Sequence, residues 1–239
     1  GTAEVAKSRS VRLIRHAENR GYGASLKTGI RHAQYKTLVI TDADGTYPNE
    51  EIPRLVQWIG DYDMAVGARA GEQVHVPLLR RPAKWMLNQL ANYLSGTKIP
   101  DLNSGLRAMK KELVFEFFRI LPDGFSFTTT ITLALLTNGY QVKYVPISYF
   151  QRVGRSKIKP IRDTLNFTFL IVRTILGFNP LKVLLPLAVL LLILGIAKSV
   201  YDVVSYDWHI ASSTIVIMMT AFQTLLLSMI ADLIVRYRR

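Results

Sequence analysis

The chain has 239 residues, which suits one catalytic domain with an appendage better than several domains. It contains no cysteine, which excludes disulfides, thiolate metal sites and cysteine nucleophiles. The formal net charge of +13, from 30 Lys and Arg against 17 Asp and Glu, favours anionic partners: nucleic acid, anionic lipid or phosphorylated substrates. The hydrophobic fraction of 49% is high for a wholly soluble protein, and its excess lies near the C-terminus.

The first two thirds of the sequence alternate short apolar runs with helical patterns. Strands that alternate with helices indicate an α/β domain with a mostly parallel sheet. We place this domain at residues 1–159, where it ends in a basic connector, residues 152–159. The expected strands are 11–14, 37–40, 64–67 and 141–147, and the expected helices are 26–34, 50–59, 80–94, 113–121 and 128–138.

Residues 160–178 form an amphipathic segment after the domain. Apolar side chains, among them Ile161, Leu165 and Phe169, recur there at three- and four-residue steps, which is typical of a helix. Its place just before a membrane-spanning segment favours a helix that lies in the lipid interface. An ordinary helix of the domain is the alternative.

Residues 179–239 contain two long apolar stretches. The only charged residue in 181–197 is Lys182, and the only one in 210–235 is Asp232. Each stretch is close to or above the roughly 18–20 residues that cross about 30 Å of hydrocarbon. We therefore expect two transmembrane helices, with buried core helices as the alternative.

The distribution of positive charge predicts the orientation in the membrane. Residues 199–209, between the two stretches, hold two aspartates but no Lys or Arg, whereas the connector and the tail Arg236–Arg239 are basic. The positive-inside rule then places the main domain and the C-terminus in the cytoplasm. The membrane is a prokaryotic plasma membrane or, in a eukaryote, the endoplasmic reticulum. A homo-oligomer is one option, because Ser213, Thr214, Gln223 and Ser228 could pack the second helix against a neighbour.

Asp42 and Asp44 follow the predicted strand 37–40 with one residue between them. Two carboxylates at this spacing can share a hard divalent cation that bridges a diphosphate. Asp61 and Asp63 have the same spacing, but they precede a strand, and the ligands of α/β sheets gather at the carboxyl ends of strands. Position therefore favours a binding site for the first pair and a solvated turn for the second.

Three further segments carry residue types that bind substrates. Asn19, Gly21 and Gly23 open a helix, where backbone N–H groups can approach a phosphate or a nucleobase, although a plain turn explains them equally well. Residues 101–107 join a carboxylate, small polar residues and a guanidinium in one turn, which could also be a capped turn. The basic loop 152–157 suits a phosphate that arrives from the membrane, or is a generic positive flank.

In this order the motifs resemble the family 2 glycosyltransferases of GT-A fold that load sugars onto polyprenyl phosphates, such as dolichyl-phosphate mannose synthases and undecaprenyl-phosphate glucosyltransferases. The resemblance implies a UDP- or GDP-linked nucleotide-sugar donor, a dolichyl or undecaprenyl phosphate acceptor, and Mg²⁺ or Mn²⁺ held by Asp42 and Asp44. The matching segments are Asn19–Ala24, Asp42–Gly45, Val66–Arg69, Asn103–Arg107 and Arg152–Lys157.

The resemblance also gives expected roles to single residues. Asp42 and Asp44 are the expected catalytic residues. Apart from the resemblance, we also expect a catalytic role for Asp101, which could orient a sugar hydroxyl. The expected substrate-binding residues are Asn19, Gly21, Gly23, Arg69, Arg80, Arg81, Ser104, Arg107, Arg152, Ser156 and Lys157.

The sequence departs from the family's pattern in two places. The family begins with strands that hold the nucleobase and ribose. Residues 1–4 resemble the segment just after those strands, so we expect the first strands to be absent from this chain. Thr46 stands where many relatives carry glutamine, which leaves a third metal ligand undefined.

The implied reaction is a single displacement with inversion at the sugar. A lipid phosphate monoester is anionic near neutral pH and needs little help from a general base, so positioning and charge neutralisation remain for the protein. A processive polysaccharide synthase is one alternative, but its Gln-x-x-Arg-Trp motif is missing from this sequence. A non-catalytic membrane scaffold of the same fold is another, against which the intact aspartate pair argues. Nucleic acid is not an expected partner, because the basic residues cluster beside apolar helices.

Overall fold

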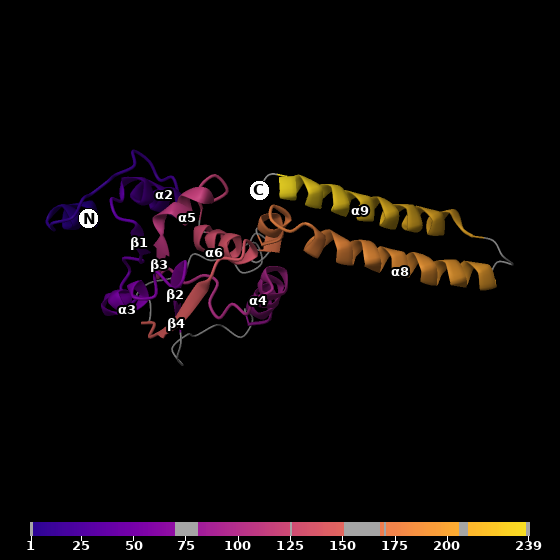
Figure 1. The fold of residues 1–239 in the computed structure, drawn as a ribbon, viewed down its shortest axis with the longest axis horizontal. Coiled ribbons are helices and arrows are strands. Elements are labelled where there is room, and N and C mark those ends of the chain that lie inside the picture. Colours follow the sequence, from indigo (N-terminus) through magenta and orange to yellow (C-terminus); the bar gives the residue numbers. More distant parts are fainter. Residues whose placement is uncertain are drawn as a thin grey trace.

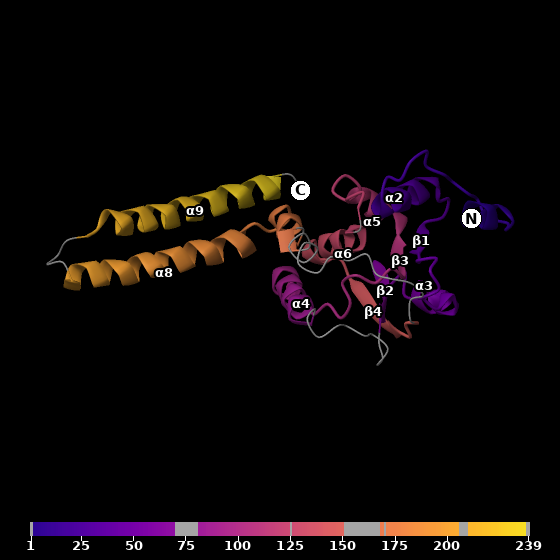
Figure 2. The ribbon, with the colours of Figure 1, turned by 180° about the vertical axis from the view of Figure 1, so that it is seen from behind.

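The computed structural model describes residues 2–69, 81–124, 126–150, 168–169, 171–205 and 210–237. A mixed α/β domain comes first, and a hairpin of two long helices projects from one side of it (Figure 1 and, from behind, Figure 2). The prediction of an α/β domain followed by two apolar helices is confirmed.

The sheet has the order β1-β3-β2-β4, with β3 antiparallel to both of its neighbours and β2 parallel to β4. β1, β2 and β4 therefore run in one direction. The expectation of a mostly parallel sheet needs a correction, because β3, which we did not predict, inserts between β1 and β2 in the opposite direction. The strands are β1 (Thr37–Ile40), β2 (Met64–Arg69), β3 (Arg107–Lys110) and β4 (Val142–Ile147).

Helices lie on both faces of the sheet. Side chains of a strand point alternately to its two faces. Met64 and Val66 of β2 accordingly pack with α2, α5 and α6, whereas Ala65 packs with α3 on the other face. The helical elements of the domain are α1 (Thr2–Lys7), α2 (Tyr22–His32), the 3₁₀ turn η1 (Asn49–Glu51), α3 (Ile52–Val56), α4 (Arg81–Ser95), α5 (Lys111–Glu116) and α6 (Phe127–Thr137).

Residues 11–14 do not form the strand that their apolar character predicts. A strand needs a neighbour with which it exchanges backbone hydrogen bonds, and none of the described strands pairs with this segment. The predicted helices agree in place with α2 to α6, although the one predicted at 113–121 is helical only over 111–116.

The amphipathic segment before the hairpin packs one of its faces on the domain. In its described part, residues 168–169 and 171–176 are helical, and Ile171 and Ile175 are buried against side chains of α4 and α6. Phe169, by contrast, is 72% exposed. Its interface position stays a prediction, but one face of this helix belongs to the core of the domain.

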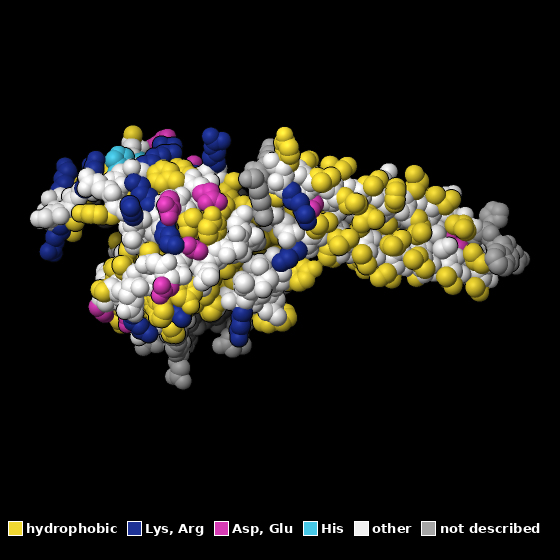
Figure 3. All heavy atoms as spheres, viewed as in Figure 1, with side chains coloured by type: hydrophobic (Ala, Val, Ile, Leu, Met, Phe, Trp, Pro, Cys, Tyr) yellow, Lys and Arg dark blue, Asp and Glu magenta, His cyan; other side chains and the backbone are white. Residues whose placement is uncertain are grey.

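The hairpin consists of α8 (Leu181–Ser205) and α9 (Ser212–Tyr237), which are long and apolar enough to cross a membrane. Within their most apolar windows only 11% and 17% of the residues are buried, which does not fit the core helices of a soluble domain. Hydrophobic side chains cover the outside of the hairpin, whereas charged side chains are concentrated on the domain (Figure 3). The two helices approach closely where Gly195 faces Met218.

A buried carboxylate closes the hairpin at its turn. Asp202 of α8 is fully buried, and its Oδ1 accepts a hydrogen bond from Nζ of Lys198 at 2.9 Å. Its Oδ2 accepts hydrogen bonds from the backbone N–H of Ala211 at 3.1 Å and from the hydroxyl of Thr214. The carboxylate of Asp202 thereby caps the start of α9. Of the residues named for packing against a second copy, Thr214 and Ser228 are buried, and Ser213 and Gln223 are exposed.

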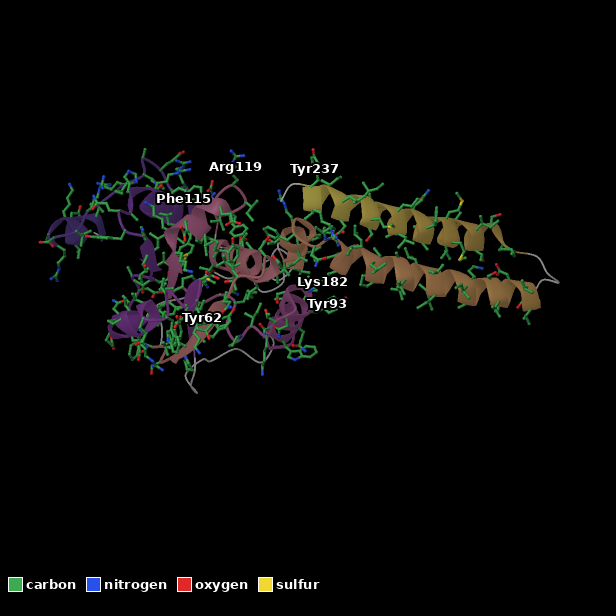
Figure 4. All side chains as sticks on the ribbon, in the orientation of Figure 1. Tyr62, Tyr93, Phe115, Arg119, Lys182 and Tyr237 are labelled. Carbon is green, nitrogen blue, oxygen red and sulfur yellow. The ribbon has the colours of Figure 1, made fainter. Side chains whose placement is uncertain are left out.

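Lys182 ties the hairpin to the domain. Its ammonium group donates a hydrogen bond to the carbonyl oxygen of Leu94 at 3.1 Å, in the last turn of α4. Figure 4 shows Lys182 next to Tyr93 of the same turn. A cation at this position suits the negative end of a helix. The first turn of α8 is thereby fixed to α4.

Candidate active site

The chain direction brings several of the predicted site residues to one edge of the sheet. Asp42 follows the end of β1 and Arg69 is the last residue of β2. Tyr149, which was not among the predicted residues, lies just after β4. Because β3 is antiparallel, the turn 101–106 before it lies at the same edge. Asp63 precedes β2 and lies at the opposite edge. The position of the strands therefore separates the two aspartate pairs as predicted.

Asp42 is held from two sides. Its Oδ1 accepts a hydrogen bond from the phenol of Tyr22, the first residue of α2, at 3.0 Å. Its Oδ2 lies so close to Gly105 that a Cβ there would be 2.4 Å away, closer than real Cβ contacts. Gly105 in turn donates its N–H to the hydroxyl oxygen of Tyr47 at 2.7 Å. Burial and the charge of Asp42 raise the pKa of Tyr22, which keeps the phenol as a donor.

Asp44 is held by the residue two positions further on. Its Oδ1 accepts the backbone N–H of Thr46 at 3.2 Å and the hydroxyl of Thr46 at 2.6 Å. Gly45 has a φ of +73°, a conformation that favours glycine. Since Thr46 is only 1% exposed and its hydroxyl is bonded to Asp44, it is placed as a support for that aspartate rather than as a third metal ligand.

The two aspartates fit the cation that the sequence predicts. Carboxylate oxygens are the hard ligands that Mg²⁺ and Mn²⁺ prefer, and Mg²⁺ commonly takes one or two carboxylates together with substrate phosphates and water. In the part of the chain that the structure describes, no group of three or more His, Asp or Glu side chains gathers to hold a metal on its own. A cation on Asp42 and Asp44 would therefore take its other ligands from the substrate and water.

Arg69 and Asp101 form a bidentate ion pair. Nε of Arg69 lies 2.6 Å from Oδ2 of Asp101, and Nη2 lies 2.8 Å from Oδ1. The same carboxylate accepts the backbone N–H groups of Arg69 and Asn103, each at 3.2 Å. Burial by itself would raise the pKa of Asp101, but the hydrogen bonds and the charge of Arg69 outweigh it and hold this pKa below its usual value.

This pair changes the predicted roles of its members. A carboxylate has about four acceptor positions, and Asp101 makes four hydrogen bonds within the chain, so the arrangement does not support its predicted contact with a sugar hydroxyl. Asp101 instead holds Arg69 in place, helped by the ring of Tyr149 at 5.3 Å from the guanidinium. Arg69 has five N–H donors on its side chain, of which the pair uses two.

Ser104 and Arg107 are fully buried, which corrects the expectation that they contact the substrate. The hydroxyl of Ser104 donates to the carbonyl oxygen of Gly67 at 2.6 Å. The guanidinium of Arg107 donates to the carbonyl oxygens of Ser104 and Thr128, at 2.6 and 3.0 Å, and to the hydroxyl of Thr132 at 2.8 Å. Burial lowers the pKa of Arg107. Both residues fix the turn before β3 to β2 and α6.

The glycine-containing segment at the start of α2 packs against the chain itself. The N–H groups of Gly23 and Ala24 donate to the carbonyl oxygens of Gly124 and Asp123, at 3.1 and 3.0 Å. A Cβ on Gly23 would lie 2.1 Å from the carbonyl oxygen of Pro122. These N–H groups are therefore not open to a phosphate, and glycine is required by the close packing.

Asn19 and Gly21 shape the loop of this segment. Oδ1 of Asn19 accepts the N–H of Gly21 at 3.0 Å, and Gly21 has a φ of +97°. Asn19 and Gly21 thus shape the loop and Gly23 packs against the chain, whereas a contact of these residues with a substrate stays a prediction. The side chain of this segment that reaches the site is Tyr22, which the sequence motifs did not single out. An aromatic hydroxyl between two glycines at the start of a helix was the signal that could have found it.

Comparison with known proteins identifies the family. The pattern of glycosyl transferase family 2 matches residues 1–118, and that of the GtrB C-terminal hairpin matches residues 179–237, which contain α8 and α9. A dolichyl-phosphate hexose transferase of Haloferax volcanii is 32% identical over 161 residues, which are 66% of this chain and 69% of the relative. The chain belongs to glycosyl transferase family 2.

Two other relatives of this family 2 glycosyltransferase are also named after a polyprenyl lipid. An undecaprenyl-phosphate mannosyltransferase of Micrococcus luteus is 27% identical over 172 residues, 66% of this chain and 71% of the relative. A polyprenol monophosphomannose synthase of Mycolicibacterium smegmatis is 31% identical over 144 residues, 57% of this chain and 54% of the relative.

Five of the predicted basic and hydroxyl residues remain without a structural description. Arg81 is the first residue of α4, but its side chain lies outside what the structure describes. Arg80, Arg152, Ser156 and Lys157 lie outside the described residues altogether. Their contacts with the phosphates of the glycosyltransferase substrates therefore stay predictions.

Proposed function

We propose that this family 2 glycosyltransferase moves a sugar from a UDP- or GDP-linked donor to a polyprenyl phosphate, such as dolichyl or undecaprenyl phosphate. The names of the three relatives support this class of acceptor. One observation carries the proposal. The same chain has a pair of carboxylates at the edge of the sheet where β1, β2 and β4 end, and an apolar hairpin that Lys182 ties to the domain. Such a chain can join a water-soluble donor to a lipid-borne acceptor.

The donor end of the site is built around Asp42 and Asp44. These two residues would hold Mg²⁺ or Mn²⁺, and the ion, when bound, neutralises charge on the diphosphate of the donor. Arg69 lies at the same edge with its guanidinium held by Asp101 and Tyr149, and the side-chain N–H donors that its pair with Asp101 does not use could bind the diphosphate. The site thus favours departure of the nucleotide diphosphate.

The acceptor end needs little acid–base chemistry. A lipid phosphate monoester has a second pKa of about 6 and is largely a dianion at neutral pH. One of its oxygens attacks the anomeric carbon while the bond from that carbon to the nucleotide diphosphate breaks, which inverts the configuration and gives a sugar linked to the lipid through one phosphate. The protein contributes positioning and charge stabilisation.

The reaction would take place at the cytoplasmic face of the membrane. The Lys and Arg residues near the hairpin lie before α8, at its start or at the end of α9, with the exception of Lys198, which pairs with Asp202 at the turn. The connecting segment 199–209 has none. The basic loop 152–157 would then lie near the lipid head groups, where it could bind the acceptor phosphate.

An assay of the full-length protein in detergent tests the proposal. Radiolabelled UDP- and GDP-sugars are offered together with a polyprenyl phosphate and Mg²⁺ or Mn²⁺. The proposal expects label from one donor in the organic-soluble fraction, as a lipid monophosphate sugar. No transfer from any donor would indicate a non-catalytic scaffold, and label in a polymer would indicate a processive synthase.

A further inference from the structure

Asp42 and Asp44 each accept a hydrogen bond from a hydroxyl group, in both cases through their own Oδ1. Tyr22 donates to Asp42 at 3.0 Å, and Thr46 donates to Asp44 at 2.6 Å. The two hydroxyls come from different elements, one from the start of α2 and the other from the turn after β1. A carboxylate that is bonded through one oxygen cannot rotate freely, so both side chains have a defined orientation.

The backbone that carries Tyr22 is itself firmly held. The N–H groups at the start of α2 donate to the carbonyl oxygens of Asp123 and Gly124. One turn further along α2, Nζ of Lys27 lies 2.8 Å from the carboxylate of Asp123. The phenol of Tyr22 therefore reaches Asp42 from a helix that is fixed at its N-terminus.

The support of Asp42 continues on its other side. Gly105 leaves room for Oδ2 of Asp42 only because it has no Cβ, and the hydroxyl of Tyr47 fixes the N–H of Gly105. Tyr47 is 6% exposed and packs edge-on against Tyr149 at 5.3 Å. The carboxylate of Asp42 is thus enclosed between a hydroxyl and a rigid backbone turn.

We infer that Tyr22 and Thr46 are positioning residues that orient Asp42 and Asp44 toward one shared divalent cation. The inference rests on the proposed function. Hydrogen bonds to ligating carboxylates fix ligand geometry, and their loss typically costs about 10- to 100-fold in metal affinity or activity. Of the two, Tyr22 makes the larger contribution, since Asp44 keeps the backbone N–H of Thr46 when the hydroxyl is removed.

The test is Mn²⁺ binding to the full-length protein, measured by electron paramagnetic resonance of free Mn²⁺ in the presence of UDP or GDP. Tyr22→Phe is expected to raise the dissociation constant about 10-fold or more, and Thr46→Val is expected to raise it by less. Sugar transfer by Tyr22→Phe should need more Mn²⁺ for half-maximal rate and should recover at high Mn²⁺. A merely structural defect would not recover in this way.

Two matched controls remove a hydroxyl from a tyrosine and from a threonine that lie outside the site. Tyr140→Phe deletes a tyrosine bond to a carboxylate, that of Glu116 at 2.7 Å, and Thr137→Val deletes a threonine bond to the carbonyl oxygen of Leu133. Both variants should bind Mn²⁺ like the unaltered protein. If the Tyr22 and Thr46 variants melt like their controls, the change in Mn²⁺ affinity reports on the site and not on folding.

The outcomes separate this inference from the proposed function. Wild-type Mn²⁺ affinity in both Tyr22→Phe and Thr46→Val, with binding abolished by Asp42→Ala, would overturn the positioning role and leave the metal site standing. A protein that transfers sugar but binds no Mn²⁺ or Mg²⁺ would overturn the inference together with the metal assignment.

Discussion

At the scale of single residues, Gly105 links the turn before β3 to Asp42. Gly105→Ala would place a Cβ 2.4 Å from Oδ2 of Asp42, so the carboxylate must leave its position. We expect a loss of sugar transfer of about 10-fold or more, as for a displaced metal ligand. Gly29→Ala is the control, because among the described residues no atom outside its own stretch of α2 lies within 4 Å of the added Cβ. That control should keep transfer and raise stability by about 0.5–1 kcal/mol. Full transfer by Gly105→Ala would contradict the geometry.

The ion pair of Asp101 predicts a dependence of stability on pH. The pKa of Asp101 in the folded chain lies below its unfolded value of about 3.9. The pair therefore stabilises the fold above about pH 4, and this contribution is lost as the pH falls through the lower, folded pKa. Thermal unfolding should show that Asp101→Asn is less stable than the unaltered protein at pH 7 and that the difference shrinks in acid. A difference that does not change with pH would speak against the ion pair.

The sequence could place Asp42 and Asp44 at the carboxyl end of β1, because a strand and the residues that directly follow it are a local pattern. It could not place Ser104 and Arg107, whose types are those of a binding site. Their burial depends on Gly67 of β2 and on two threonines of α6, Thr128 and Thr132, which only the folded chain brings to them.

At the scale of elements, whether a predicted helix or strand agrees with the structure depends on the length and the hydrophobicity of its sequence segment. β1 contains three consecutive apolar residues after Thr37, and α8 and α9 are long apolar runs, so these elements were predicted in the right places. β3 is only four residues long and carries a charge at each end, which hid it in the sequence. Its antiparallel direction is set by pairing with β1 and β2, which no local pattern encodes.

The turn of the hairpin predicts the effect of two aspartate substitutions. Asp202→Ala removes the cap of α9 and leaves Lys198 and Thr214 without their shared partner, so it should lower the thermal unfolding midpoint in detergent. Asp232→Ala removes the i,i+4 pair with Arg236, whose side chain is 72% exposed, and should change little. Equal effects of the two substitutions would show that Asp202 does not hold the turn.

At the scale of the whole molecule, the orientation in the membrane can be tested directly, because the chain has no cysteine. Tyr35→Cys places a single thiol on the domain, where Tyr35 is 80% exposed, and Ser213→Cys places one at the far end of the hairpin. A membrane-impermeant maleimide added to intact cells should label Ser213→Cys and spare Tyr35→Cys. The reverse pattern would place the domain outside the cytoplasm.

Asp42 and Asp44 are proposed to serve the transfer of sugar to a membrane lipid. The measurement is the amount of radiolabelled sugar that the full-length protein moves from its nucleotide-sugar donor into the organic-soluble lipid fraction with Mg²⁺ or Mn²⁺. Asp42→Asn and Asp44→Asn should each reduce it by at least about 100-fold, as expected when a directly bound cation is lost. Asp61→Asn, from the equally spaced pair at the opposite edge, should leave it unchanged. Undiminished transfer by the Asp42 and Asp44 variants would contradict the account.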